Sequence, residues 1–318
     1  MAKEMLLIGG ATPRMMDRFA ADFDTVHELS KVDDRAAFLS QHGAGIMAVA
    51  TNGHDGVPAD IMDALPNLKI ISGYGVGYDA VDTDTAVERG IVVTHTPNVL
   101  NDEVANTAIM LMLTLYRNFL HDEAYVRSGR WEAEGNAPLS RSPSNRTVGI
   151  LGLGRIGETI AEKLRAFRAT VVYHSRNPKK VDYKYYGDLK EMAADVDVLI
   201  VSTPGGPATD KLVNREVLDA LGPEGTLINV SRGSVVDEAA LVLALQEGRL
   251  GYAGLDVFEA EPKVPEALLT MPNVVLLPHV GSATIETRQD MGDLVCDNLT
   301  QFLEDGTTIT PVPECAHL

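Results

Sequence analysis

Three ionisable side chains in the second half of the chain have the chemistry needed to reduce a carbonyl group. Arg232, Glu261 and His279 each come shortly after an apolar run that is typical of a buried strand. An arginine presents a planar fork of donors to a carboxylate, and a histidine is the usual proton donor near neutral pH. A nearby carboxylate favours the charged imidazolium and orients it. The three residues therefore suit the reduction of a 2-keto acid to a 2-hydroxy acid.

Each of these residues also has an ordinary structural interpretation. Arg232 could form a surface ion pair, His279 could cap the end of a strand, and Glu261 is one of 45 acidic residues. The hypothesis of a catalytic site rests on the combination of the three.

A glycine pattern in the middle of the chain is typical of dinucleotide binding. A short apolar run leads directly into Gly152-x-Gly154-x-x-Gly157, and a helical pattern follows. Gly152 permits a tight turn, Gly154 lets the backbone approach a pyrophosphate, and Gly157 lets helix and strand pack closely. We expect the free N–H groups at the helix start, where Arg155 and Ile156 lie, to hold the phosphates.

The segment that carries an acidic residue in many NAD-binding proteins has none here. About twenty residues beyond the glycines, the chain reads Ser175-Arg176-Asn177-Pro178-Lys179-Lys180. A hydroxyl and several cations suit a 2′-phosphate, and Arg176 can stack on adenine. We therefore expect Ser175, Arg176 and Lys179 to bind the cofactor and NADP(H) to be preferred over NAD(H). A solvated basic turn is the structural alternative.

The elements that must position these residues predict an α/β fold. Apolar runs alternate with helical stretches, as in parallel βαβ units with helices on both faces of a sheet. Expected strands are Met5–Ile8, Thr25–Leu29, Ile46–Thr51, Leu68–Ser72, Ile91–Thr94, Val148–Leu151, Thr170–Tyr173, Val198–Ser202, Leu227–Val230, Tyr252–Val257 and Val274–Leu277. Helices are expected at Ala59–Leu65, Asp82–Glu88, Asp102–Leu120 and Glu286–Leu303, and a loop at Trp131–Asn145. In such sheets ligands bind at the carboxyl ends of the strands, where the candidate residues lie.

Composition limits the classes of partner. The 318 residues carry 27 Lys+Arg and 45 Asp+Glu, so the formal net charge of −18 leaves no overall basic surface for nucleic acid or an anionic membrane. Cys296 and Cys315 are too few for a disulfide framework, and no Cys-x-x-Cys spacing indicates a metal site. No apolar window approaches the ~20 residues of a membrane span. We expect a cytoplasmic protein that binds no metal, membrane or nucleic acid.

Four motifs, in this order, resemble those of the D-isomer-specific 2-hydroxyacid dehydrogenase family. They are Gly152-x-Gly154-x-x-Gly157, Asn229–Gly233, Gly254–Pro262 and Pro278–Thr284. The similarity covers nearly the whole chain and includes Gly75–Asp79 and Thr96–Leu100. Within the family, Ser175-Arg176, Tyr185-Tyr186-Gly187 and the run Leu276–Ser282 are similar to NADPH-preferring glyoxylate/hydroxypyruvate reductases and hydroxyphenylpyruvate reductases.

The resemblance implies a role for each site residue. Arg232 would bind the substrate carboxylate and carbonyl, His279 would donate the proton, and Glu261 would support it. The backbone N–H groups at Val76 and Gly77 would help to hold the carboxylate. The further cofactor residues that it implies are Thr203, Pro204, Val230, Ser231 and Asp256, with Asp256 at the nicotinamide amide. The substrate would be glyoxylate, hydroxypyruvate or an aryl pyruvate.

The resemblance also implies two Rossmann-like or flavodoxin-like parallel-sheet domains with a cleft between them. Residues 1–98 and 286–318 would form the substrate domain, and residues 99–285 the dinucleotide-binding domain. An arm at about residues 99–146 would join two copies in a homodimer.

Two other functions are weighed against this one. A dinucleotide-sensing binding protein or corepressor is possible on the same fold, but the intact set of Arg232, Glu261 and His279 disfavours it. Formate oxidation is disfavoured because formate enzymes that resemble this family usually place Gln at the position of Glu261.

Overall fold

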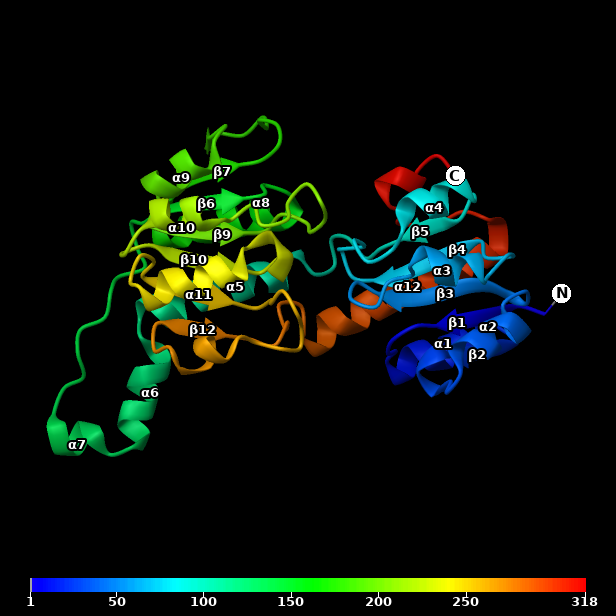
Figure 1. Ribbon diagram of the computed structural model, residues 1–318, viewed down its shortest axis with the longest axis horizontal. Coiled ribbons are helices and arrows are strands. Elements are labelled where there is room, and N and C mark those ends of the chain that lie inside the picture. Colours follow the sequence, from blue (N-terminus) through cyan, green and yellow to red (C-terminus); the bar gives the residue numbers. More distant parts are fainter. Residues whose placement is uncertain (1) are drawn as a thin grey trace. The chain divides into compact units, whose positions relative to one another are not determined.

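Strands that are mostly buried and apolar, most of them followed by a helix, build two parallel sheets (Figure 1). The computed structural model describes residues 2–318. The chain divides into two compact units, one formed by Met1–Leu100 with Ala283–Leu318 and the other by Asn101–Ser282. The expected fold class, α/β with two parallel-sheet domains, is confirmed.

The first unit contains a five-stranded sheet in the order β2-β1-β3-β4-β5. Its strands are β1 Glu4–Leu7, β2 Thr25–Glu28, β3 Ile46–Asn52, β4 Ile70–Tyr74 and β5 Val92–Thr94. Its helices are α1 Pro13–Asp22, α2 Arg35–His42, α3 Ala59–Asp63, α4 Thr83–Glu88 and α12 Ile285–Asp305. Alternate strand residues point to opposite faces, so Met5 packs with Phe19 of α1 while Leu6 packs with Met62 of α3.

The C-terminal helix α12 completes the core of this first unit. Its residues Val295 and Leu299 are at most 1% exposed and lie in one cluster with β1, β3 and α1. The Val295 carbonyl also accepts a hydrogen bond from the hydroxyl of Ser72, at 3.1 Å. Thr284 caps the start of the helix, and Gly306 ends it in the left-handed conformation, with φ 80°.

The second unit contains a seven-stranded sheet in the order β12-β11-β10-β9-β6-β7-β8. Its strands are β6 Thr147–Leu151, β7 Thr170–His174, β8 Lys184–Tyr185, β9 Val198–Val201, β10 Thr226–Asn229, β11 Tyr252–Leu255 and β12 Val274–Leu276. Its helices are α5 Asn101–Tyr116, α6 Phe119–Arg127, α7 Arg130–Glu134, α8 Arg155–Leu164, α9 Leu189–Asp195, α10 Arg215–Leu221 and α11 Glu238–Gln246. Helices α9 to α11 share one large apolar cluster with the sheet.

Helix α5 lies against α8 and the strands β10 to β12. It passes so close to the sheet that a Cβ on Gly254 would lie 3.1 Å from the side chain of Leu111. A glycine in this strand therefore allows the close approach of the helix.

Two of the expected elements were wrong in detail. The apolar stretch Asp102–Leu120 is not one helix, because Asn118 adopts the left-handed conformation with φ 51° and separates α5 from α6. Trp131 lies in the short helix α7 and not in a loop. The two-residue strand β8 was not expected at all. Among residues 2–318, no helix is long and apolar enough to cross a membrane.

Candidate active site

The strands β10, β11 and β12 end side by side in the second unit. Asn229 lies opposite Leu255, and Leu255 lies opposite Leu276, in parallel register. The chain therefore leaves all three strands at the same edge of the sheet. Arg232 follows the first of these strands and His279 the last.

Asn229 shapes the loop that carries Arg232. Its side chain is 1% exposed, and its amide nitrogen donates to the Arg232 carbonyl at 2.9 Å. The amide oxygen accepts from the backbone N–H and the hydroxyl of Ser231, at 3.1 and 2.9 Å. The guanidinium of Arg232 donates to the Ser231 carbonyl at 2.9 Å. Asn229 was not among the predicted site residues, although a short amide at the end of a buried apolar strand is a signal for such a role.

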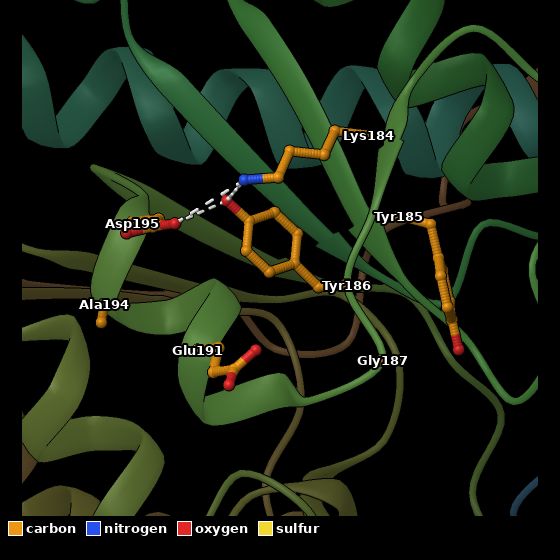
Figure 2. Close-up of a pocket in the computed structure, with 7 residues that line it drawn as sticks. All are labelled: Lys184, Tyr185, Tyr186, Gly187, Glu191, Ala194 and Asp195. Carbon is orange, nitrogen blue, oxygen red and sulfur yellow. Dashed lines mark hydrogen bonds and ion pairs between the residues drawn. The ribbon is translucent and has the colours of Figure 1, made fainter.

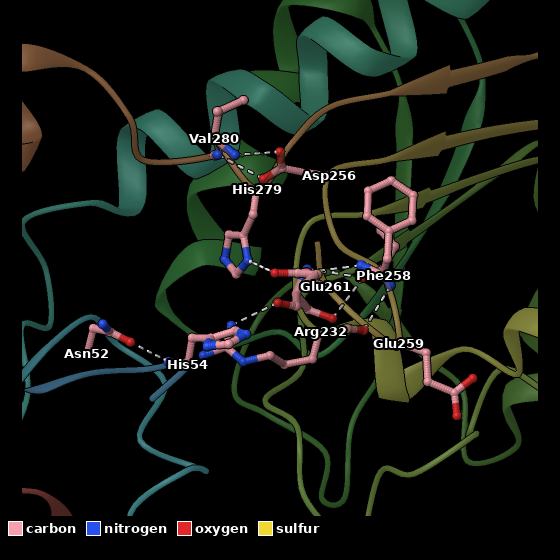
Figure 3. Close-up of polar contacts among 12 residues, drawn as sticks. Asn52, His54, Arg232, Asp256, Phe258, Glu259, Glu261, His279 and Val280 are labelled. Carbon is pink, nitrogen blue, oxygen red and sulfur yellow. Dashed lines mark hydrogen bonds and ion pairs between the residues drawn. The ribbon is translucent and has the colours of Figure 1, made fainter. Parts of the chain in front are cut away.

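His279 and Glu261 form a hydrogen-bonded pair (Figure 3). The imidazole Nδ1 lies 2.7 Å from Glu261 Oε2, and the other carboxylate oxygen accepts the backbone N–H of Phe258 at 3.0 Å. Burial raises the pKa of Glu261, but these two hydrogen bonds and the charges of His279 and Arg232 outweigh it, so this pKa lies below its ordinary value. Glu261 is thus a carboxylate near neutral pH, and its contact at Nδ1 leaves the Nε2 side of the ring for another partner.

Asp256 holds the loop on which His279 lies. The residue is 1% exposed, and its carboxylate accepts the backbone N–H of Val280 at 2.7 Å (Figure 3). It also accepts the backbone N–H of Gly281 at 2.8 Å. Burial raises the pKa of Asp256 despite these two hydrogen bonds. Thr107 of α5 also donates to the Gly281 carbonyl, at 3.2 Å. The resemblance placed Asp256 at the nicotinamide amide; in the structure, both carboxylate oxygens already accept N–H groups of the protein.

The glycine turn between β6 and α8 leaves room for a phosphate. Gly152 has φ 94°, and a Cβ there would lie 2.7 Å from the backbone of Thr203. A Cβ on Gly157 would lie 2.3 Å from the Gly152 carbonyl oxygen, whereas a Cβ on Gly154 would meet nothing within 4 Å. Gly154 is also the N-cap of α8, whose first residues are Arg155 and Ile156. Open space at a helix N-terminus fits the pyrophosphate of a dinucleotide.

The other predicted cofactor residues in this unit follow the strands next to β6. Thr203 and Pro204 come after β9, and the Pro204 carbonyl accepts the hydroxyl of Thr209 at 2.7 Å. Val230 and Ser231 come after β10. Since β9 lies between β6 and β10 in the sheet, these segments and the glycine turn share one edge.

The turn after β7 carries the predicted 2′-phosphate residues. The Ser175 hydroxyl donates to the Asn177 carbonyl at 2.7 Å, and the Ser175 carbonyl accepts the hydroxyl of Tyr185 at 3.2 Å. Lys179 forms an ion pair with Glu158. Tyr185 of β8 thus fixes the start of the turn, a contact that the sequence analysis did not foresee.

A hollow of about 470 Å³ lies beside β8 (Figure 2). It is lined by Lys184, Tyr185, Tyr186, Gly187, Glu191, Ala194 and Asp195. The Lys184 ammonium donates to the Tyr186 hydroxyl at 2.6 Å, and that hydroxyl donates to Asp195 at 2.7 Å. Three of the polar side chains that line this hollow, Lys184, Tyr186 and Asp195, therefore bind one another.

The predicted residues of the first unit lie just after β4. Gly75 has φ 152°, and its carbonyl accepts the backbone N–H of Thr96 at 2.8 Å. The Val76 carbonyl lies 3.0 Å from Nδ1 of His95, which therefore donates the proton. These contacts fix the carbonyls of the loop that carries the Val76 and Gly77 N–H groups.

Comparison with known proteins identifies the family. Residues 109–281 match the family model described as D-isomer specific 2-hydroxyacid dehydrogenase, NAD binding domain. The chain belongs to this family. The family resemblance and the expectation of an oxidoreductase that acts on 2-hydroxy or 2-keto acids are thereby confirmed.

Several known proteins resemble this 2-hydroxyacid dehydrogenase along most of their length. It is 49% identical to hydroxyphenylpyruvate reductase of Plectranthus scutellarioides, over 86% of this chain and 88% of that protein. It is 43% identical to 2-ketogluconate reductase of Gluconobacter oxydans, over 97% of this chain and 98% of that protein. Among solved structures, the NADPH-dependent glyoxylate/hydroxypyruvate reductase of Sinorhizobium meliloti in complex with NADP and malonate is similar, with a TM-score of 0.94 and 49% sequence identity. The similarity covers 99% of this chain and 98% of that protein.

The part of the dehydrogenase that the structure describes, residues 2–318, holds no cluster of three or more His, Cys, Asp or Glu side chains able to bind a metal ion.

Proposed function

We propose that this protein reduces a small 2-keto acid to the D-2-hydroxy acid with NADPH. The observation that carries the proposal is the 2.7 Å contact between Nδ1 of His279 and the Glu261 carboxylate. The charge of Arg232 acts on the same carboxylate, which supports a common site for the three side chains. This combination supplies a proton donor, an orienting base and an anion-binding group.

Arg232 and the loop after β4 are assigned to substrate binding. The guanidinium binds the substrate carboxylate in a bidentate manner and polarises the neighbouring carbonyl. The backbone N–H groups of Val76 and Gly77 are assigned to carboxylate binding as well.

His279 is assigned the proton transfer. Glu261 holds the Nδ1–H of the ring, so that Nε2–H points to the substrate and donates its proton to the carbonyl oxygen. When bound, NADPH supplies the hydride that the carbonyl carbon accepts. His279 then recovers a proton from solvent. A positioned general acid of this kind accelerates the reaction by about 10²- to 10⁴-fold.

The dinucleotide is assigned to the turn after β6. Gly152, Gly154 and Gly157 allow the pyrophosphate to approach the N–H groups at Arg155 and Ile156. The remaining cofactor contacts come from Thr203, Pro204, Val230, Ser231 and Asp256. The NADPH preference is assigned to Ser175, Arg176 and Lys179, and the similarity to an NADPH-dependent reductase solved with NADP supports it.

The proposed substrates are glyoxylate, hydroxypyruvate and aryl pyruvates. Relatives named for glyoxylate, hydroxypyruvate and hydroxyphenylpyruvate reduction support this choice. The unit that contains β1 to β5 is assigned to the substrate, and the unit that contains β6 to β12 to the cofactor.

We further assign residues 99–146 to the interface of a homodimer. Large apolar side chains in this segment are exposed, among them Phe119 at 58%, Trp131 at 58% and Leu139 at 102%. Exposed apolar groups gathered in one segment are typical of an interaction surface.

Consumption of NADPH and NADH with a panel of keto acids tests the proposal. We expect turnover of glyoxylate, hydroxypyruvate or hydroxyphenylpyruvate, faster with NADPH than with NADH. A protein that binds NADPH but turns over no keto acid would be a dinucleotide-sensing protein instead. A preference for NADH would contradict the role of Ser175 and Arg176.

A further inference from the structure

Lys179 is tied to an acidic residue on the helix that follows the glycine turn. Its Nζ lies 3.0 Å from Oε1 of Glu158, which belongs to the first turn of α8. The neighbouring cations Arg176 and Lys180 differ, because neither has a carboxylate within 4.0 Å among residues 2–318. One of the three charges offered to a 2′-phosphate is therefore already paired.

Hydrogen bonds to Tyr173 fix the backbone of Lys179, whereas its side chain is partly exposed to solvent. The hydroxyl of Tyr173 accepts the Lys179 N–H at 2.7 Å and lies 3.4 Å from the Lys179 carbonyl oxygen. Tyr173 is itself only 1% exposed. The side chains of Lys179 and Glu158 are 39% and 50% exposed, so the ion pair can open without a change in the fold.

The position of the pair relates it to the cofactor. The Gly152 N–H donates to the His174 carbonyl at 2.9 Å, which places the glycine turn beside the end of β7. In this fold the dinucleotide runs from the helix N-terminus to the end of the second strand, where the adenosine ribose lies. Glu158 and Lys179 come from the two elements that border this path.

We propose that Glu158 sets the strength of the NADPH preference by competing with the 2′-phosphate for Lys179. The inference rests on the proposed use of NADPH. A 2′-phosphate takes over the ammonium and leaves the Glu158 carboxylate to solvent, so that breaking the ion pair weakens NADPH binding. NADH carries a hydroxyl at this position and leaves the ion pair intact.

The dissociation constants of NADPH and NADH, measured by fluorescence titration without substrate, test this competition. Glu158→Gln is expected to lower the Kd for NADPH by about two- to fivefold, the range of an exposed ion pair. Its Kd for NADH is expected to stay unchanged. Glu162→Gln is the matched control, because Glu162 is exposed on the same helix and makes no ion pair with Lys179. It should change neither constant.

The same titration in a Lys179→Ala background shows whether Glu158 acts through the lysine. There, Glu158→Gln is expected to lose its effect on NADPH. If Glu158→Gln keeps its full effect in the Lys179→Ala background, the competition is overturned. Weaker NADPH binding by the single variant Glu158→Gln would also overturn it, because the carboxylate would then position the lysine. Thermal unfolding of each variant checks that it folds.

Failure of the cofactor proposal is visible separately, in the wild-type protein. Wild-type protein that binds NADH as tightly as NADPH would contradict the cofactor preference itself. Wild-type protein that prefers NADPH, with an unaltered NADPH affinity in Glu158→Gln, would overturn only the role of Glu158.

Discussion

The backbone N–H of His279 donates a hydrogen bond to the carbonyl oxygen of Asp256, over 2.8 Å. His279 has φ 55°, a left-handed conformation that costs a residue with a side chain some strain. The Asp256 carboxylate accepts the next two N–H groups, from Val280 and Gly281. The buried aspartate therefore stabilises the backbone conformation that presents the imidazole.

Replacing Asp256 by Asn should loosen this loop. The amide keeps one acceptor oxygen but turns an NH₂ group toward a backbone N–H, so one buried donor loses its partner. We expect a loss of about 1–3 kcal/mol in the free energy of unfolding, with a lower kcat. Urea unfolding and steady-state kinetics measure the two effects. Unchanged stability would mean that the N–H group facing the new NH₂ finds another partner.

His279→Gln should abolish most keto acid reduction and leave cofactor binding intact. The amide cannot donate a proton as an acid, so kcat is expected to fall by about 10²- to 10⁴-fold. The Kd for NADPH should stay near the wild-type value. A variant that retains its full kcat would exclude His279 as the proton donor.

Glu261→Gln should slow reduction. The variant retains an acceptor for His279 Nδ1, but the charge-assisted hydrogen bond that orients the ring becomes a weaker neutral one. We expect kcat to fall by about tenfold, with the Kd for NADPH unchanged. Steady-state kinetics with NADPH saturating measure the change. An unchanged kcat would rule out a role for the charge of Glu261.

The effect of Glu261→Gln on stability should depend on pH. Because the pKa of Glu261 is lowered in the folded protein, its carboxylate contributes stability above its unfolded pKa, whose ordinary value is 4.5, and loses it as the pH falls through the folded pKa. The difference in unfolding free energy between wild type and Glu261→Gln should therefore shrink on acidification below that value. Urea unfolding at pH 7 and at pH values below 4.5 gives the comparison. A difference in unfolding free energy that grows on acidification would contradict this prediction.

Arg232→Lys should show the importance of the planar fork. Lysine keeps the positive charge but cannot bind a carboxylate in the bidentate manner. Loss of one charge-assisted hydrogen bond, about 1.5–3 kcal/mol, predicts a drop in kcat/KM of roughly 10- to 150-fold. Because Arg232 is assigned to the keto acid and not to the cofactor, the Kd for NADPH should stay unchanged and serves as the control. Near-normal kcat/KM would remove Arg232 from the substrate site.

Two glycines of the dinucleotide turn should respond differently to alanine. Gly154→Ala adds a methyl group to open space, so it should fold normally and weaken NADPH binding about tenfold by blocking the pyrophosphate. Gly157→Ala meets the Gly152 carbonyl oxygen and should lower stability by about 1–3 kcal/mol. Thermal unfolding and NADPH titration separate the two effects. Equal destabilisation by both changes would contradict the distinction.

The sequence could predict the elements that depend on local pattern. The strand before Gly152 and the helix after it were expected, because an apolar run, a glycine turn and a helical period are all readable from neighbouring residues. The contact between Glu261 and His279 followed from the rule that parallel strands end at one edge. These predictions needed no knowledge of side-chain packing.

Other features depend on contacts that a pattern does not show. The break at Asn118 requires one residue to leave the helical conformation between two segments that are both helical. The Asp256 carboxylate binds N–H groups that lie 24 and 25 positions further along the chain. Glu158 and Lys179 are 21 positions apart. Only the register of β6, β7, β11 and β12 brings these pairs together.

The return of α12 to the first sheet affects the order in which the protein folds during synthesis. The second unit is a continuous stretch of chain, so it can fold as soon as Ser282 has left the ribosome. The first sheet is made earlier, but the face that Val295 and Leu299 cover stays exposed until α12 appears. A nascent chain of this protein thus carries an uncovered apolar surface until α12 has been made.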